Sequence, residues 1–263
     1  MKLGLERRVA LVAASSRGLG RATAAELAAE GASVIMCARN EDELARAAEQ
    51  IAAASGARVV PVAGDLSQPD DVQRIVTTGV TALGPVDILV TNTGGPPAGP
   101  FESHDRAAWH EAVRQNLDSV LELTWAVLPG MKERRWGRII NVTSIAVKQP
   151  VDNLMLSNSV RAAVTGFART LANEVARFGV TVNNVLPGYT ETQRVVELAG
   201  RIATDKQITP EEARAEWERQ IPMGRLGEPR EFAALVAFLS SERASYITGT
   251  SIPVDGGWVR GLL

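Results

Sequence analysis

The sequence predicts one α/β domain of three layers, in which helices cover both faces of a doubly wound, mostly parallel sheet. Three observations favour this class. Short β-rich runs alternate with helix-length amphipathic stretches along almost the whole chain. Runs such as Ile88-Leu89-Val90 are apolar throughout, which is typical of strands buried on both faces. No long Pro- or Ser-rich linker divides residues 1–263, so we expect a single domain.

Seven runs have the length and composition of strands: Val9–Ala14, Ser33–Cys37, Arg58–Val62, Ile88–Thr91, Arg138–Thr143, Val180–Leu186 and Thr250–Val254. Helix-length segments lie between them, among them Gly20–Glu30, Glu41–Ser55, Pro69–Leu83, Asp105–Lys132 and Asn153–Phe178. Strands and helices that alternate in this way predict a parallel sheet with right-handed crossovers.

Two of these segments carry further information. In Asp105–Lys132 an apolar stripe advances by alternating fours and threes, and Asn116 is the polar residue on it. The first turns of Asn153–Phe178 are rich in small residues, which allows close packing against a neighbour or a ligand.

Residues 191–220 are charged and helical in character where another strand is due. They form either a helical lid over a site or a solvated surface excursion, and the sequence leaves both open.

Composition excludes several classes of protein. The 263 residues, 45% of them apolar, suffice for a substantial core. The formal net charge is −2 and no Lys/Arg run stands out, so we expect no nucleic-acid partner. The apolar run at Val9–Ala14 is too short for a signal peptide, and no stretch is long enough to cross a bilayer. We therefore expect a cytoplasmic protein with no membrane partner.

Cys37 is the only cysteine of the chain. An intramolecular disulfide is therefore excluded, and a reducing compartment fits. No thiol or histidine accompanies Cys37 in sequence, so a small residue buried in a strand is favoured over a reactive one. We also expect no metal site.

A glycine-containing turn follows the first expected strand. Gly18 and Gly20 stand at the start of a helix-length segment. Glycine lets the backbone approach a ligand closely, and the helix start offers free N–H groups and the positive end of its dipole. Its position at the first strand of an alternating array indicates a phosphate-binding turn of a dinucleotide site.

Ala13-Ala14-Ser15-Ser16-Arg17-Gly18-Leu19-Gly20 resembles the TGxxxGxG turn of the short-chain dehydrogenase/reductase family, which has a Rossmann-type fold. Ala13 and Ala14 stand where that motif has threonine and its first glycine. The resemblance implies cofactor contacts for Ala14, Ser16, Arg17, Gly18, Leu19 and Gly20. Alanine is tolerated at position 14 if φ is negative there, and costs about 1 kcal/mol or more if φ is positive.

The end of the second expected strand indicates which dinucleotide binds. A carboxylate there would accept a hydrogen bond from the ribose 2′-hydroxyl and select NAD, but Ala38 offers none. Arg39 and Arg17 are instead available to a 2′-phosphate, to which guanidinium groups donate strong hydrogen bonds. Family members with basic residues at these two places favour NADP(H), which we expect as the cofactor. The alternative is two surface arginines.

Further stretches match motifs of the family in chain order. Asp65-Leu66 resembles the pair that contacts adenine, and Asn92 with Gly94 keeps part of the NNAG motif. The stretch from residue 187 to residue 192 resembles the one that holds the nicotinamide carboxamide. This implies cofactor contacts for Pro187, Gly188, Thr190 and Thr192. The ending, from Gly224 to Gly257, closely resembles 3-oxoacyl-[acyl-carrier-protein] reductases.

The family reduces a carbonyl with Asn, Ser, Tyr and Lys acting together. By resemblance, Asn116 takes the place of the asparagine and Ser144 that of the serine. The Tyr-x-x-x-Lys pair is absent, because its slot reads Ser157-Asn158-Ser159-Val160-Arg161. The resemblance thus assigns catalytic places to Asn116, Ser144, Ser157 and Arg161, with Arg161 also at the cofactor ribose. A structural role for Asn116, as a satisfied kink, stays open.

The two replacements change the chemistry of proton transfer. A phenol can be brought toward neutrality by an adjacent cation, whereas an aliphatic hydroxyl such as that of Ser157 is a far weaker acid. Arg161 stays protonated, so it can hold ribose hydroxyls or stabilise an oxyanion but cannot pass on a proton. Tyr189, Lys148 and Asp152 are the other candidates for the donor, and each is favoured as a loop or pocket-wall residue.

Two hypotheses follow from these residues. The first is an NADP(H)-dependent reductase that acts on a small carbonyl or alcohol substrate, such as an acyl thioester, with water steadied by Ser157 and Arg161 as the proton source. The second is an NADP(H)-binding sensor or scaffold that has lost the chemistry and kept the fold. In both cases the resemblance implies a homo-oligomer, either a dimer or a tetramer.

Overall fold

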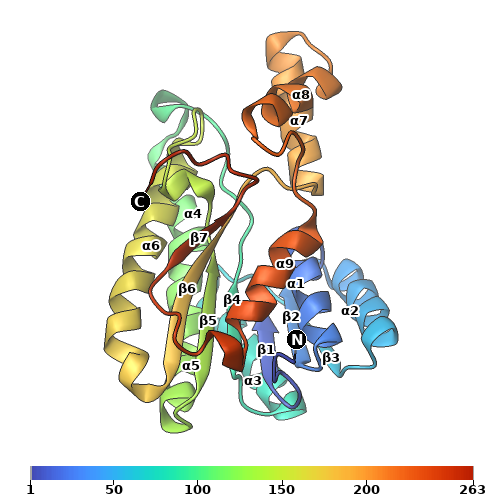
Figure 1. The fold of residues 1–263 in the computed structure, drawn as a ribbon, viewed down its shortest axis with the longest axis vertical. Coiled ribbons are helices and arrows are strands. Elements are labelled where there is room, and N and C mark those ends of the chain that lie inside the picture. Colours follow the sequence, from blue (N-terminus) through green and yellow to red (C-terminus); the bar gives the residue numbers. More distant parts are fainter. Residues whose placement is uncertain (1, 263) are drawn as a thin grey trace.

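A computed structural model describes residues 2–262 of the chain. Its centre is one seven-stranded sheet in the order β3-β2-β1-β4-β5-β6-β7, and every neighbouring pair of strands is parallel (Figure 1). The strands are β1 (Val9–Val12), β2 (Ser33–Ala38), β3 (Val59–Ala63), β4 (Ile88–Thr91), β5 (Gly137–Val142), β6 (Val180–Pro187) and β7 (Ser251–Val254).

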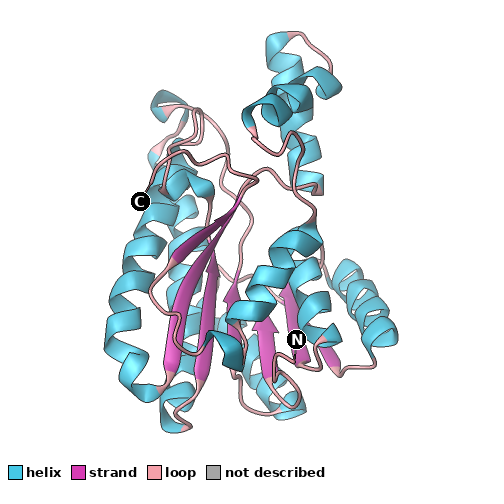
Figure 2. Cartoon of the chain, in the orientation of Figure 1, coloured by secondary structure: helices cyan, strands magenta, loops and turns pink. Residues whose placement is uncertain are grey.

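Helices cover both faces of this sheet, as Figure 2 shows. They are α1 (Gly18–Ala29), α2 (Glu41–Ser55), α3 (Pro69–Leu83), α4 (Arg106–Val113), α5 (Ser119–Glu133), α6 (Met155–Val175), α7 (Gln193–Lys206), α8 (Pro210–Gln220) and α9 (Pro229–Leu239). Buried residues of α1, α2 and α9 pack in one hydrophobic cluster, and buried residues of α3, α5 and the second half of α6 pack in another. Of the helices described, none is both long and apolar enough to span a membrane.

Successive residues of a strand belong alternately to these two clusters. On β1, Ala10 and Val12 join the cluster with α1, whereas Val9 and Leu11 join the cluster with α3 and α5. This is the two-residue period of a strand with both faces buried. Cys37 is likewise a buried residue of β2. The predicted three-layer α/β fold and the burial of Cys37 are therefore confirmed.

The first strand is shorter than expected, and the reason lies in the turn that follows it. β1 ends at Val12 rather than at Ala14, and α1 begins at Gly18 rather than at Gly20. The amide of Ala13 still donates to the carbonyl of Val90, but Ala14 has a positive φ of 46° and leaves the strand direction. The chain thus turns two residues before the end of its apolar run.

The segment expected as one helix over 105–132 is interrupted. A π-helical turn at Arg114–Asp118 separates α4 from α5, and the buried Asn116 lies within it. The side chain of Asn116 donates to the carbonyl of Ala112 at 3.1 Å and accepts from the hydroxyl of Thr93 at 2.9 Å. The expectation of one regular helix was wrong, because the wide turn carries an extra residue that an apolar stripe does not reveal.

Residues 191–220, which we call the insert, form α7 and α8 and lie beyond the carboxyl ends of the strands (Figure 1). A capping box between Thr209 and Glu212 starts α8. Trp217 of α8 stacks on Tyr189 with ring centroids 4.8 Å apart, and this contact joins the insert to the end of β6.

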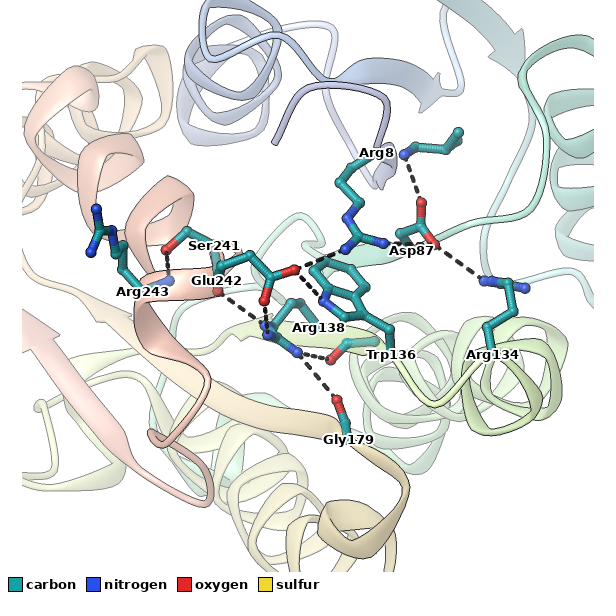
Figure 3. Close-up of polar contacts among 11 residues, drawn as sticks. Arg8, Asp87, Arg134, Trp136, Arg138, Gly179, Ser241, Glu242 and Arg243 are labelled. Carbon is teal, nitrogen blue, oxygen red and sulfur yellow. Dashed lines mark hydrogen bonds and ion pairs between the residues drawn. The ribbon is translucent and has the colours of Figure 1, made fainter. Parts of the chain in front are cut away.

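A charged cluster joins the amino ends of several strands at the opposite edge of the sheet (Figure 3). Arg138, at the start of β5, is 2% exposed and donates to the carbonyls of Gly137, Gly179 and Ser241. Its guanidinium lies 4.4 Å from the ring of Trp136 and 3.8 Å from the carboxylate of Glu242. This cluster holds the loops before β5 and β6 and the segment after α9 together, far from the carboxyl edge.

We expect Arg138→Met to lower the free energy of unfolding by about 2–3 kcal/mol, because three buried carbonyls lose their donor. Urea denaturation would measure the change. Arg230→Met is the control, since Arg230 is 79% exposed and pairs only with Glu228 at the surface. Equal stabilities of the two variants would contradict a structural role for the cluster.

Candidate active site

A cleft of about 470 Å³ opens at the carboxyl edge of the sheet. It lies where the strand order reverses, because β1 pairs with β2 on one side and with β4 on the other. In open α/β sheets, ligands bind at such a point. Of the residues predicted to contact cofactor or substrate, all line this cleft except Gly20 and Asn116.

Gly20 does not line the cleft but packs against the backbone of the turn. A Cβ at Gly20 would lie 2.9 Å from both the carbonyl carbon of Ala14 and the side-chain nitrogen of Asn92, so no larger residue fits. Asn92 in turn donates to the carbonyl of Ala14 at 3.3 Å. Gly18 has a φ of +57°, a conformation that glycine adopts without strain. The two glycines therefore shape the turn at the start of α1, where free N–H groups face the cleft.

Ala14 is the strained residue of this turn. Its φ of 46° lies in the left-handed region. Of the two alternatives that the sequence leaves open, the structure has the costly one, at about 1–2 kcal/mol for a residue with a Cβ. The close approach of Gly20 to the Ala14 carbonyl fixes this conformation, so the strain is a consequence of the turn.

Arg17 and Arg39 line one end of the cleft. Among residues 2–262, neither forms an ion pair with a carboxylate within 4.0 Å. Glu43, in the first turn of α2, lines the same end and accepts from the hydroxyl of Ser16 at 3.3 Å. The sequence reasoning missed Glu43, although its position four residues after Arg39 in a helix start could have indicated it.

The middle of the cleft is formed by the loops after β3, β4 and β6. Asp65 and Leu66 follow β3, Asn92 and Gly94 follow β4, and the stretch from Pro187 to Thr192 ends β6 and enters α7. Gly188 contacts the carboxy-terminal segment closely, because a Cβ there would lie 2.8 Å from the Cα of Asp255. The predicted cofactor contacts thus come from separate strand ends that meet at one edge.

Ser144, Ser157 and Arg161 line the other end of the cleft. Ser144 follows β5 and its hydroxyl accepts from the amide of Ala146 at 3.1 Å. Ser157 and Arg161 are buried and one turn apart on α6. Leu156 and Val160, on the same helix, pack against α4, which fixes the direction of these side chains. Asn116 does not line the cleft and connects to it through the hydroxyl of Thr93.

Burial sets the electrostatics of Arg161. Loss of solvent, and to a smaller extent the charge of Arg194, lower the pKa of its guanidinium to about 10. One of its nitrogens donates to the carbonyl of Val142 at 2.9 Å. With a pKa of about 10 the group is still protonated at neutral pH. The end of the cleft lined by Ser144, Ser157 and Arg161 therefore holds a fixed positive charge and two serine hydroxyls.

The other candidates for the proton donor lie elsewhere. Tyr189 packs between Trp217 and Trp258, and burial raises the pKa of its phenol. Tyr189, Lys148 and Asp152 are absent from the described lining of the cleft. This favours the interpretation of the three as loop residues over that of a proton donor.

Two further residues of the insert line the cleft and were missed from the sequence, Arg194 and Glu197. Arg194 donates to the carbonyl of Pro96 at 3.3 Å, across the cleft from its own helix. No sequence signal links these two segments, because they lie far apart in the chain and meet only through a long side chain. Within the part of the chain that the structure describes, no group of three metal-ligating side chains is found.

Comparison with known proteins identifies the family. The family model described as Enoyl-(Acyl carrier protein) reductase matches residues 13–259. The 3-oxoacyl-[acyl-carrier-protein] reductase FabG of Vibrio cholerae is 38% identical over 97% of this chain and 98% of its own. The chain belongs to the short-chain dehydrogenase/reductase family. Acetoacetyl-CoA reductase of Allochromatium vinosum is 34% identical over 95% of this chain and 98% of its own.

Solved structures of this family share the fold closely. L-sorbose reductase of Gluconobacter frateurii, complexed with NADPH and L-sorbose, superposes with a TM-score of 0.94, 32% identity and complete coverage of both chains. Actinorhodin polyketide ketoreductase with NADPH gives a TM-score of 0.93 and 32% identity over 97% of this chain and 98% of its own. YwfH, an NADPH-dependent reductase of bacilysin biosynthesis, gives a TM-score of 0.92 and 30% identity over 97% and 99%.

We expect Ala14→Gly to raise the free energy of unfolding by about 0.5–1 kcal/mol, because glycine relieves the positive φ at a smaller entropic cost. Denaturant titration would measure the gain. The neighbouring Ala13→Gly is the control and should lose about 1 kcal/mol, since the buried Ala13 has no positive φ to relieve. A loss of stability in both variants would contradict the strain at Ala14.

We expect Glu43→Gln to tighten the binding of NADPH about fivefold, because it removes a carboxylate from the end of the cleft lined by Arg17 and Arg39. Calorimetric titration with NADPH and with NADH would test this, and the affinity for NADH, which has no 2′-phosphate, should change less. Glu49→Gln, on the exposed side of the same helix, is the matched control. Equal gains for NADPH and NADH would place the 2′-phosphate elsewhere.

Proposed function

We propose that this protein is an NADP(H)-dependent oxidoreductase that transfers hydride between the cofactor and a small carbonyl or alcohol substrate, with a non-standard proton source. The observation that carries the proposal is one continuous cleft with Arg17 and Arg39 at one end and Ser144, Ser157 and Arg161 at the other. The similarity to 3-oxoacyl-[acyl-carrier-protein] reductases and to reductases solved with NADPH supports it.

The residues present fit the cofactor. Gly20 and Gly18 leave the backbone free to approach a pyrophosphate, and the two arginines offer donors to a 2′-phosphate. The loops after β4 and β6 would hold the rest of the dinucleotide through Asn92, Gly94, Gly188 and Thr190. When bound, NADPH supplies the hydride. Side chains at the other end of the cleft orient the substrate, stabilise the developing charge and hold the water that supplies the proton.

In the proposed mechanism, Ser144 and Ser157 donate hydrogen bonds to the carbonyl oxygen and orient the substrate. Negative charge that develops on this oxygen is stabilised by the buried Arg161, which is worth more in a site shielded from water than at the surface. Arg161 keeps its proton, so a water molecule held by Ser157 and Arg161 protonates the oxygen, and the hydroxide that remains takes a proton from bulk solvent. Asn116 and Thr93 support the arrangement through their hydrogen bond.

The substrate class follows from the relatives and from the cleft. Several relatives are named for 3-oxoacyl thioesters or acetoacetyl-CoA, and solved neighbours for sugars and polyketides. A ketone with an acyl thioester is our first candidate. Residues 191–220, several of which line the cleft, act as a lid over it, and the enzyme works as a homo-oligomer.

A second candidate is an NADP(H)-binding sensor or scaffold without turnover. The observation that favours it is the absence of both the phenol and the amine at positions 157 and 161. The binding end of the cleft would then be maintained and the reacting end would not.

The two candidates are separated by incubating enzyme at stoichiometric concentration with NADPH and a panel of 3-oxoacyl thioesters, aldehydes and ketones. Cofactor oxidation by the parent supports the oxidoreductase. Activity that appears only in the double variant Ser157→Tyr with Arg161→Lys supports the sensor. Absence of NADPH binding, measured by calorimetry, would reject both.

The hydride-transfer rate should be flat between pH 6 and 9 and should fall as the pH rises through about 10, the lowered pKa of Arg161. The sign follows because the protonated guanidinium stabilises the oxyanion and is lost above its pKa. Single-turnover absorbance at saturating NADPH would measure the profile. A sigmoidal drop near pH 7 would instead reveal a titrating acid that this mechanism does not contain.

A further inference from the structure

Arg194 spans the cleft from the insert to the opposite wall. It lies in the first turn of α7, and its guanidinium donates to the carbonyl of Pro96 in the loop after β4 at 3.3 Å. The guanidinium lies directly against Gly95, because a Cβ there would be 2.7 Å from the Cζ of Arg194. The absence of a side chain at position 95 therefore leaves room for this contact.

The charge of Arg194 is not neutralised by an ion pair within the described residues, since no carboxylate there lies within 4.0 Å of it. Its positive charge contributes to the lowered pKa of Arg161, which lines the same cleft. Burial and then the charge of Arg201 lower the pKa of Arg194, and Glu197, one turn further along α7, acts in the opposite direction with a smaller effect. Two like charges that face one cavity favour the entry of an anion between or beside them.

The start of α7 also lies beside the phosphate-binding turn. A Cβ built on Gly18 would be 3.7 Å from the methyl group of Thr192, the residue that precedes α7. The backbone of Arg194 thus lies near the turn at the start of α1, and its side chain reaches the loop after β4. Because β4 lies between β1 and β5, the side chain of Arg194 crosses the middle of the cleft. It lies between the end lined by Arg17 and Arg39 and the end with Ser144, Ser157 and Arg161.

We propose that Arg194 is a clamp residue that donates to the central pyrophosphate of the bound dinucleotide and so holds the insert closed over it. The proposal rests on the proposed use of NADP(H). A pyrophosphate would lie at the start of α1, and Thr192, the residue that precedes α7, lies against Gly18 of that turn, so this is the anion of the dinucleotide that the insert borders. The bond to the Pro96 carbonyl keeps the guanidinium in place on the opposite wall.

The experiment compares Arg194→Gln with Arg219→Gln, an exposed arginine on α8 of the same insert. Each variant and the parent is titrated by calorimetry with NADPH and with adenosine 2′,5′-bisphosphate, which has the 2′-phosphate but lacks the pyrophosphate. We expect Arg194→Gln to weaken NADPH binding about tenfold or more, the loss of one charge-assisted hydrogen bond, and to leave the bisphosphate affinity unchanged. Arg219→Gln should bind both ligands as the parent does.

A second readout follows the insert itself. NADPH should slow Glu-specific proteolysis within residues 191–220 of the parent and of Arg194→Lys, which keeps the charge, but not of Arg194→Gln. Unchanged NADPH affinity in Arg194→Gln would overturn the clamp. So would an equal loss of NADPH and bisphosphate affinity, or a loss confined to a carboxylate-bearing substrate in the ternary complex. A parent that binds no NADPH would instead reject the proposed function.

Discussion

The parallel pairing of β1 with β4 is the contact on which the site depends. β1 has β2 on its other side, so the loops that leave β1 and β4 diverge from adjacent strand ends. One loop carries the turn from Ala14 to Gly20, and the other carries Asn92 and Gly94. The bond from Asn92 to the Ala14 carbonyl joins the two loops at the floor of the cleft. The strand order therefore brings together the two loops that form the floor of the ligand-binding cleft.

The two ends of the cleft use positive charge in different ways. Arg17 and Arg39 are held at the rim, where charge attracts a phosphate group from solvent. Arg161 is buried on α6 and bonded to the Val142 carbonyl, so its charge is desolvated and fixed in direction. A fixed charge of this kind suits a developing oxyanion, whereas a group that must exchange protons needs a pKa near the working pH. In the proposed function, the chain combines a conventional binding end with an electrostatic reacting end.

Much of the fold could be predicted because burial on strands and helices leaves a periodic trace, as Ile88-Leu89-Val90 shows. The residues predicted to contact the cofactor could be placed in one cleft because they stand at fixed offsets from strand ends, and parallel strands bring those ends together. The rest depended on tertiary contacts. The φ of Ala14 is set by the packing of Gly20, and the reach of Arg194 to Pro96 joins loops that no local pattern connects. Asn116 kept a helical spacing although its turn is not α-helical.

The π-helical turn at Arg114–Asp118 has a consequence for how this helix tolerates change in length. Such a turn holds one residue more than an α-helical turn, so α4 is offset in rotation from α5 by about 100° relative to a continuous helix. Deleting one residue here would convert the segment to a regular helix and rotate α4 by that amount. Leu156 and Val160 of α6 would then meet a different face of α4, and Asn116 would swing away from Thr93. Single-residue deletions should therefore be less tolerated at this turn than conservative substitutions.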